Sequence, residues 1–529
     1  MTDQGQLCEA SAAAGDPSNT AVSCVDSWRY GSPSFDACTD DPHATTTSLA
    51  DKAARLDRLG EVLHVHPGDD RVHDVTVRAG LTDATATETD VIDWHPQEND
   101  GLWTGLYIAS QAFRYAVTRE PGVLDHLRVL MDGFERGMKI TGDPGVFTRE
   151  YITPGLTGMA CPTDPSAYIP DVEKDDNKWV KIDTDGTVLV YDPTAAAFTR
   201  TSHKVPAEYA GYCWLDNVSK DEYAGHMMGL GTLLKLVDDP GIHARAEALA
   251  EQVADHLMRN RMVFIDWDGR ITEHGRLWPT AIDDFPDFNA ILGLNHVKIG
   301  AVASGRADLR QFYDDCLLQK SGPTNCIQRF PSVEKPYTYW LNATGLYVGH
   351  DACMSNWNNL GMEFSAILTL VWYEQDPSTR AELQSFLENK MYRNHDNIRE
   401  MARQGNAAWS FVEAAMKSEG PGSTGPDYDA VHTGVCALRE FPESKARPEL
   451  HVGEDLFPTD LSCESRFDGV FLTHDAVPVW ERCPRNFTWW AIPYEHQDCT
   501  ADPTEIAQPA DYLLAYWMGR YFGFIDPSW

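Results

Sequence analysis

The stretch AVTREPGVLDHLRVL, residues 116–130, ends one apolar helix and begins another within a few residues. Pro121 follows an acidic residue at this junction, and proline suits the first turn of a helix because its missing N–H needs no partner there. The same acidic-proline step recurs in KLVDDPGIHARAEAL (235–249) and WYEQDPSTRAELQSF (372–386), and VASGRADLRQFYDD (302–315) is a version without proline. These junctions predict repeated antiparallel pairs of helices.

The first helix of each pair is the more apolar and aromatic, as in LWTGLYIASQAFRYAV (102–117), and the second is the more charged. Such pairs assemble as a solenoid, a stacked bundle or a closed toroid. An inner ring of apolar helices within an outer ring of amphipathic helices is typical of the toroid, whereas solenoid repeats have more uniform lengths. We therefore predict a mainly α fold, an (α/α) toroid or barrel of helix pairs.

The remaining segments are expected to surround this toroid. Residues 1–90 are predicted to form a loop-rich N-terminal head, tied by disulfides and packed on the core, and residues 91–529 the toroid domain. An insertion at 141–214 contains WVKIDTDGTVLVYD, which predicts a β-hairpin around its Asp-Gly turn. Insertions of this length are often lids over a site. Residues 420–500 are predicted to be rich in loops.

The balance of charge limits the classes of partner. With 43 Lys+Arg against 80 Asp+Glu, the formal net charge is −37, and such a field repels nucleic acid and anionic membrane surfaces. The sequence has no run of about 18 apolar residues, so no membrane span is expected. We expect a monomer whose partner is neither nucleic acid nor a membrane.

The 12 cysteines form no CxxC pair and are spread through loops. This pattern indicates structural disulfides formed in an oxidising compartment, so the protein is predicted to be secreted or periplasmic. Cys316 and Cys326 are the most probable local bridge by spacing, because a turn with Gly322 and Pro323 lies between them.

Three segments could carry chemistry, and the first is WHPQENDGLWTGLY, residues 94–107. His95, Asn99, Asp100, Trp103 and Tyr107 gather here at one end of an apolar helix. Asp100 is also a good helix N-cap, which is a sufficient structural explanation by itself. The clustering of an acid, an amide, a histidine and two aromatic rings nevertheless favours a substrate site.

The second segment is DNVSKDEYAGHMMGLG, residues 216–231. Ser219 and Glu222 match a capping box, yet Asp221, Glu222 and His226 are an unusual set of polar residues for an apolar helix. Glu222 and His226 are four residues apart and share a face. We assign them, with Asp221, to acid–base catalysis; a metal site would need a third ligand, and the sequence identifies none.

The third segment, VGHDACMSNWNNLGMEF (348–364), precedes another apolar helix and offers His350, Asp351, Asn356 and Trp357. These residues also suit caps and turns. Corresponding ends of inner helices meet at one mouth of a toroid, so the three segments are predicted to line a single pocket. Arg149 and Trp409 are smaller candidate contributors to substrate binding.

Three motifs in order, ENDGLWTGLYIASQAFRYAVT (98–118), SKDEYAGHMMGL (219–230) and NAAWSFVEAA (406–415), resemble signatures of a family of secreted bacterial helical proteins. In architecture the chain is similar to the (α/α)-toroid carbohydrate-active enzymes, such as unsaturated glucuronyl hydrolases and toroid polysaccharide lyases. The resemblance spans about residues 90–420 and implies a carbohydrate substrate. It assigns no individual catalytic residue.

These features predict a glycoside hydrolase that cleaves a poly- or oligosaccharide with paired carboxyl groups, Asp100 with Asp221 or Glu222, supported by His226. The 16 Trp residues suit the stacking of sugar rings. A polysaccharide lyase with a histidine or tyrosine base is one alternative, and the net charge of −37 counts against its anionic substrate. A non-catalytic glycan-binding surface protein is another. No cofactor is expected, although a structural or substrate-bridging divalent cation stays open.

Overall fold

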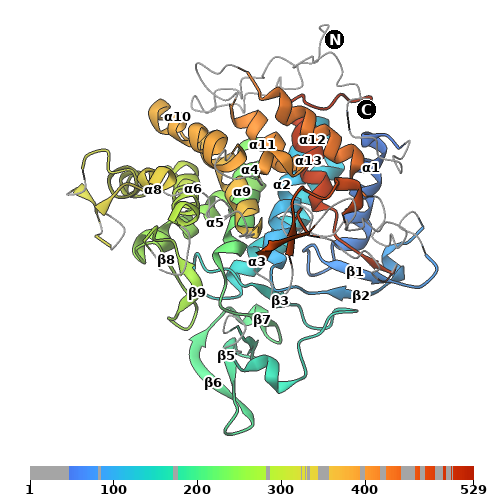
Figure 1. Cartoon of the computed structure of the whole chain (residues 1–529). Helices are drawn as coiled ribbons and strands as arrows, with labels where there is room; N and C mark the ends of the chain where they lie inside the picture. The colour runs from blue at the N-terminus through green and yellow to red at the C-terminus, as the bar shows by residue number, and fades with distance from the viewer. Residues whose placement is uncertain are drawn as a thin grey trace.

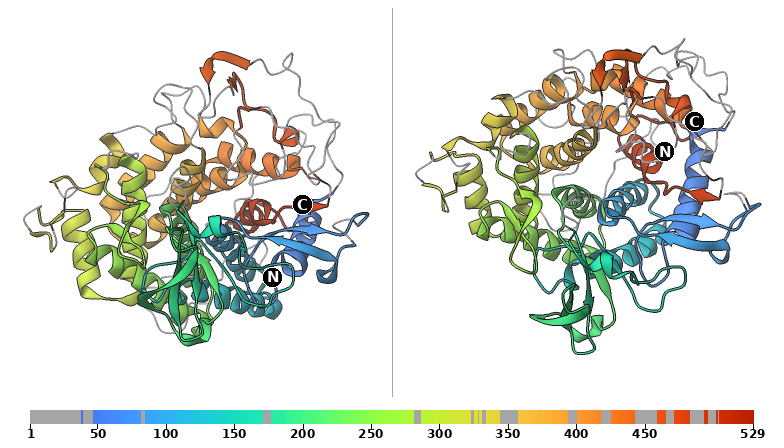
Figure 2. Two further views of the ribbon diagram at one scale, coloured as in Figure 1. Left: turned by 90° about the horizontal axis from the view of Figure 1, so that it is seen from below. Right: turned by 60° about the horizontal axis from the view of Figure 1, so that its bottom comes forward.

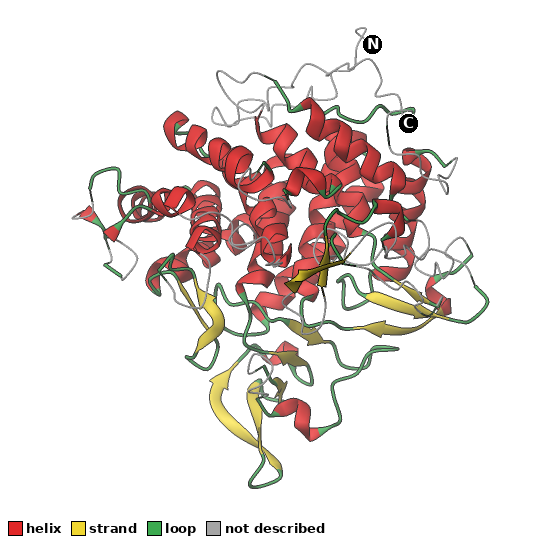
Figure 3. Cartoon of the chain, in the orientation of Figure 1, coloured by secondary structure: helices red, strands yellow, loops and turns green. Residues whose placement is uncertain are grey.

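A computed structural model describes residues 38, 47–81, 85–170, 177–280, 286–322, 325–327, 329–330, 334–343, 357–393, 400–417, 425–442, 459–464, 471–482, 493–495, 502 and 504–529. Helices dominate this part of the chain, and small β-sheets accompany them (Figure 3). The prediction of a mainly α fold is therefore confirmed.

In the described part of the chain, six α-helices form most of the buried interior. They are α2 (Asp100–Thr118), α4 (Lys220–Leu236), α6 (Pro286–Ser304), α9 (Trp357–Tyr373), α11 (Ala407–Lys417) and α13 (Ala510–Tyr521). Each helix packs against the next in this order, and α13 also packs against α2. The apolar members of the predicted pairs are therefore the buried ones, because an apolar surface on every side of a helix is removed from water only in the interior.

The closest helix packing in this interior is between α2 and α4. A Cβ atom at Gly105 of α2 would lie 2.1 Å from the carbonyl oxygen of Gly225 in α4. Only a residue without a side chain permits this approach of the two backbones. The glycines thereby bring the starts of both helices together.

A second set of helices covers this interior. It comprises α1 (Leu49–Leu59), α3 (Pro121–Lys139), α5 (Pro240–Arg259), α7 (Ala307–Gln311), α8 (Tyr337–Ala343), α10 (Pro377–Phe386) and α12 (Tyr428–Glu440). The predicted junctions are confirmed, since Pro121, Pro240 and Pro377 each begin a helix. Asp239 and Asp376 cap two of these helices through their side chains, as acidic residues at such positions do.

The N-terminal and C-terminal parts of the described chain meet. Helix α1 packs against α13, and Lys52 of α1 donates hydrogen bonds to the carbonyl groups of Arg439 and Phe441 at the end of α12. The stretch at 420–500, expected to be rich in loops, contains helix α12. No helix in the described residues is long and apolar enough to cross a bilayer.

Most of the strands lie at one end of the helical body (Figure 1). They are β1 (Asp74–Val77), β2 (Val91–His95), β3 (Glu150–Ile152), β4 (Trp179–Ile182), β5 (Thr187–Asp192), β6 (Ala197–Lys204), β7 (Cys213–Leu215), β8 (Val263–Ile265), β9 (Ile271–Arg276), β10 (Thr459–Glu464), β11 (Phe471–Thr473) and β12 (Glu505–Ile506). Strands β2, β7 and β9 precede α2, α4 and α6 in the chain, so these three helices start at the strand-covered end.

The insertion forms a five-stranded antiparallel sheet in the order β3-β7-β4-β5-β6. The predicted hairpin is confirmed, because β4 pairs with β5 through Lys181 and Leu189. Figure 2 shows this sheet, coloured green, outside the helical body. A second sheet, in the order β12-β1-β2, joins the two ends of the described chain.

Three disulfides join described cysteines. Cys316–Cys326 confirms the predicted local bridge. Cys161–Cys213 joins a loop of the insertion to its strand β7, and Cys38–Cys436 spans 398 residues to reach α12. Such bonds fit a protein that folds in an oxidising compartment.

Candidate functional site

Asp100 lies at the start of α2 and is 1% exposed. The N-cap of this helix is Asn99, and Asp100 is the first helical residue. Its Oδ2 atom lies 2.9 Å from Nδ1 of His73, as an ion pair. The alternative that Asp100 is present as a helix cap is therefore wrong.

His73 is held between two carboxylates. Its Nε2 atom donates to Oδ2 of Asp69 at 2.9 Å, and the same oxygen accepts from Nε of Arg71 at 3.0 Å. Burial alone lowers the pKa of His73, but Asp100 and Asp69 outweigh it and raise the pKa to about 9. Burial likewise opposes ionisation of Asp69, yet Arg71 and His73 lower its pKa to about 2. The group facing Asp100 at neutral pH is thus an imidazolium.

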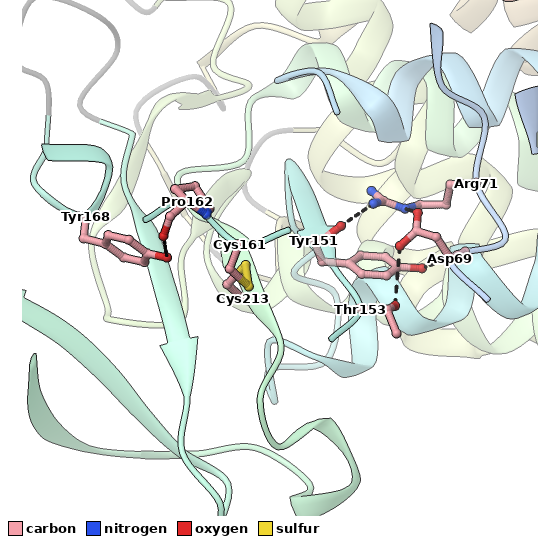
Figure 4. The surroundings of a disulfide bond; sticks show 8 residues. All are labelled: Asp69, Arg71, Tyr151, Thr153, Cys161, Pro162, Tyr168 and Cys213. Atoms are coloured by element: carbon pink, nitrogen blue, oxygen red, sulfur yellow. Dashed lines mark hydrogen bonds and ion pairs between the residues drawn. A yellow bond between two sulfur atoms is a disulfide. The ribbon is translucent and has the colours of Figure 1, made fainter. Parts of the chain in front are cut away.

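Strand β3 also takes part in this network, through Tyr151, which Figure 4 shows beside Asp69 and Arg71. Arg71 donates to the carbonyl oxygen of Tyr151, and its guanidinium carbon lies 3.7 Å from the centroid of the Tyr151 ring. The Tyr151 hydroxyl donates to the carbonyl oxygen of Asp69 at 2.9 Å. Disulfide Cys161–Cys213 lies beside this network (Figure 4). The loop that carries His73 is therefore fastened to the insertion.

Glu222 of α4 reaches the start of α2. Its Oε2 atom accepts a hydrogen bond from the backbone N–H of Leu102 at 3.0 Å. The predicted capping box is wrong, because the side chain of Ser219, the N-cap of α4, makes no capping hydrogen bond. Burial raises the pKa of Glu222 well above its usual value; the charge of Arg149 opposes this shift, and Asp100 adds to it. Its buried surroundings therefore favour the protonated form of the Glu222 carboxyl group.

The first turn of α2 leaves room for this contact only because it contains Gly101. A Cβ atom there would lie 2.4 Å from Oε2 of Glu222 and 2.3 Å from Cε1 of His226. Both distances are far below van der Waals contact. Gly101 therefore permits Glu222 to cap the neighbouring helix.

A third acid, Glu150 at the start of β3, is 2% exposed. Burial and the charge of Asp100 raise its pKa well above the usual value. We call Asp100, Glu150 and Glu222 the acid cluster. Around it, four buried oxygens make no hydrogen bond within the described structure: Asn99 Oδ1, Glu150 Oε1, Ser219 Oγ and Glu222 Oε1. Buried polar atoms normally have partners, so this group of acceptors suits a polar ligand.

Arg149 and His226 border the acid cluster. Arg149 lies 3.1 Å from Oε1 of Glu98 and donates from Nε to the carbonyl oxygen of Asn217 at 2.8 Å. The His226 ring packs against Phe147, with centroids 3.8 Å apart. Burial lowers its pKa to about 3, so His226 is a neutral, packed ring that supports Glu222 from within the same helix.

Other predicted site residues lie elsewhere. Trp103 is buried in α2. The hydroxyl of Tyr107 lies 3.1 Å from His126, on the side of α2 that faces α3. Trp409 stacks on Phe364 in the core, with centroids 5.1 Å apart.

Asp221 lies in the first turn of α4 but outside the acid cluster, and it accepts a hydrogen bond from Nδ2 of Asn358 at 3.3 Å. Trp357 begins helix α9. His350, Asp351 and Asn356 lie outside the described residues. His95 lines a cavity beside the start of α2.

Besides the acid cluster, two more acidic residues are buried near each other: Asp287 of α6 and Glu363 of α9. Burial raises the pKa of Asp287 to about 7, and burial together with Asp287 raises the pKa of Glu363 well above its usual value. Nearby, Lys220 of α4 donates to Asn289 of α6 at 2.9 Å. The N-terminal halves of α4, α6 and α9 therefore lie close together.

Sequence reasoning missed Asp69, His73 and Glu150. The loop HPGDDRVHD (66–74) concentrates histidine and charged residues, and that density was the available signal. Glu150 belongs to FTRE (147–150), a segment that the sequence offers only as a smaller contributor and in which Arg149 was the residue selected. Their importance depends on contacts between segments that are distant in sequence.

Comparisons with protein-family models, with curated proteins and with solved structures find no match for this chain. Within the described residues, no group of three or more His, Cys, Asp or Glu side chains is arranged to hold a metal ion. The residues of the acid cluster are thus the basis for assigning its chemistry.

Proposed function

We propose that this protein is a secreted carbohydrate-active enzyme, a glycoside hydrolase that cleaves a poly- or oligosaccharide with paired carboxyl groups. One observation carries the proposal: Asp100, paired with the His73 imidazolium, and Glu222, whose pKa burial raises, occupy the touching starts of α2 and α4. Glycosidases need one carboxyl group that donates a proton and another that acts as base or nucleophile.

In this mechanism Glu222 donates its proton to the glycosidic oxygen as the bond to the anomeric carbon breaks. Asp100 either accepts a proton from the attacking water or attacks the anomeric carbon itself. His73 is a positioning residue, because its ion pair orients the Asp100 carboxylate. Glu150, whose pKa burial raises and whose Oε1 is unpartnered among the described residues, would hydrogen-bond a sugar hydroxyl.

The architecture proposed for this enzyme is an (α/α) toroid. It is supported by the order in which the six interior helices pack and by the return of α13 to α2. Secretion is supported by the three disulfides. A toroid presents the starts of its inner helices at one mouth, which suits the position of the acid cluster.

Incubation with a panel of neutral, amino and uronic glycans tests the function. We expect new reducing ends from at least one glycan, without a new ultraviolet-absorbing C=C bond. Products that carry such a bond would identify elimination and contradict hydrolysis. Saturable binding with no cleavage of any glycan would instead favour a glycan-binding protein.

A further inference from the structure

A row of four buried charges leads from the loop before β1 to the acid cluster. The four groups alternate in sign, and each is at most 3% exposed: Arg71, Asp69, His73 and Asp100. Nε of Arg71 and Nε2 of His73 lie 3.0 and 2.9 Å from the same oxygen of Asp69. On the other side of the imidazole ring, Nδ1 of His73 lies 2.9 Å from Oδ2 of Asp100. Away from water, each charge depends on its neighbours of opposite sign, so the cation beside Asp100 depends on Asp69.

The backbone of His73 is fixed independently of its ring. Its N–H donates to the carbonyl oxygen of His64 at 2.9 Å, and Nδ1 of His64 donates to the carbonyl oxygen of His73 at 2.7 Å. Burial lowers the pKa of His64, so this second ring is neutral. With the backbone held, the orientation of the His73 ring is decided by the carboxylates at its two nitrogens.

The carboxylate of Asp69 is held in place by two other elements. Oγ1 of Thr153 lies 3.5 Å from its second oxygen, and Figure 4 shows the two side chains facing each other. Arg136 of α3 donates to the carbonyl oxygen of Asp69 at 3.0 Å, and the hydroxyl of Tyr151 in β3 donates to it at 2.9 Å. Asp69 therefore presents a fixed anion to His73.

The ionisable groups around this row come from several elements. Besides its four members they are His64 and Asp74 of the same segment, Arg136 of α3, and Glu150 and Tyr151 of β3. The cation Arg136 opposes a proton on His73. Burial raises the pKa values of Glu150 and Tyr151 and so disfavours their anions. Asp100 and Asp69 are the groups that raise the pKa of His73 to about 9.

Removing the charge of Asp69 would leave Arg71 and His73 as neighbouring cations. Arginine keeps its proton in proteins, so His73 would release one and Asp100 would face a neutral ring. We propose that Asp69 is a positioning residue for the cleavage reaction, which acts through His73 to keep an oriented cation beside the Asp100 carboxylate. The inference rests on the proposed function for the catalytic role of Asp100.

Initial rates of cleavage of the best glycan across the pH range test this inference with Asp69→Asn. Asparagine can still accept from Nε2 of His73, so the variant removes the charge and keeps the hydrogen bond. Because Asp69 raises the pKa of His73, its loss moves the deprotonation of His73, and with it the decline in rate, to lower pH. We expect kcat to fall about ten- to hundredfold at about pH 8 and far less at about pH 6, with KM little changed.

Asp70→Asn is the matched control, because it makes the same chemical change one residue further along. Oδ2 of Asp70 lies 3.0 Å from Arg136, and its φ of 63° is one that asparagine also adopts. The rates of this variant should follow those of the wild type at every pH. A fall in Asp69→Asn that is equal at all pH values, or one that Asp70→Asn shares, would show a merely structural role and overturn the inference.

Nuclear magnetic resonance of the full chain with isotope-labelled histidine follows the same proton without an activity assay. The signals of His73 are those absent from His73→Gln. We expect His73 to titrate at about pH 9 in the wild type and at lower pH in Asp69→Asn. The wild-type titration stays decisive if Asp69→Asn does not fold, and a pKa near the ordinary 6.5 there would overturn the inference. Cleavage of no glycan, with His73 titrating as expected, would overturn only the proposed function.

Discussion

At the scale of single residues, the ion pair between His73 and Asp100 makes a prediction about pH. The pKa of His73 is about 9 in the folded protein against an ordinary value of 6.5. A raised pKa stabilises the folded state fully below the unfolded value, and this stabilisation is lost as the pH rises through the folded value. The loss amounts to about 3 kcal/mol for a shift of this size.

Urea unfolding of the wild type and of His73→Gln at several pH values measures this contribution. We expect the wild type to exceed the variant most below pH 6.5, and the difference to shrink by about 3 kcal/mol through pH 9. Asp287 and Glu413, whose pKa values are raised to about 7 and 8 by burial, add slopes of the same sign to both proteins. A difference that does not change with pH would contradict the proposed charge on His73.

At the scale of helices, the contact between α2 and α4 depends on glycine. Gly105→Ala would place a methyl group 2.1 Å from a backbone carbonyl oxygen, and overpacking of this kind costs about 1–3 kcal/mol or more. Gly122→Ala in the first turn of α3 is the matched control, since a Cβ there meets nothing within 4 Å. Thermal unfolding should show a clear decrease in stability for Gly105→Ala and none for Gly122→Ala. Equal effects would contradict the close packing.

The helices also show which parts of the fold and of the candidate site can be predicted from the sequence. Helix junctions at Pro121, Pro240 and Pro377 were predictable, because proline acts on the backbone locally. Asp100 and Glu222 were found because they start apolar helices. Their capping explanations were wrong because the partners of both side chains belong to other elements.

The residues that surround Asp100 could not be predicted from the sequence, for the same reason. Asp69 and His73 are close to Asp100 only after β1 pairs with β2, and Glu150 only after β3 pairs with β7. Local periodicity contains no information on these pairings. Burial, which raises the pKa values of Glu150 and Glu222, is likewise a property of the folded chain.

At the scale of the whole molecule, disulfides connect distant parts of the chain. Cys38–Cys436 joins the N-terminal part to α12, and Cys161–Cys213 closes a loop within the insertion. Peptide mapping without reduction should recover these two cross-links and Cys316–Cys326. Reduction should lower the melting temperature, because each bridge of this kind contributes about 2–4 kcal/mol. Free thiols at all six positions would contradict this account and the proposed secretion.

The central claim is that Glu222 donates a proton during glycoside cleavage. Its most direct test is the initial rate of cleavage of the best glycan by Glu222→Gln, beside Glu413→Gln as a control. Glu413 is also fully buried with a raised pKa, but it lies on α11, near Lys417 and Asp427. Glutamine in place of Glu222 can still accept from the Leu102 N–H, so stability should change little.

We predict that Glu222→Gln lowers the rate about 10²–10⁴-fold at a melting temperature close to that of the wild type, while Glu413→Gln cleaves at close to the wild-type rate. A wild-type rate in a well-folded Glu222→Gln protein would contradict the central claim.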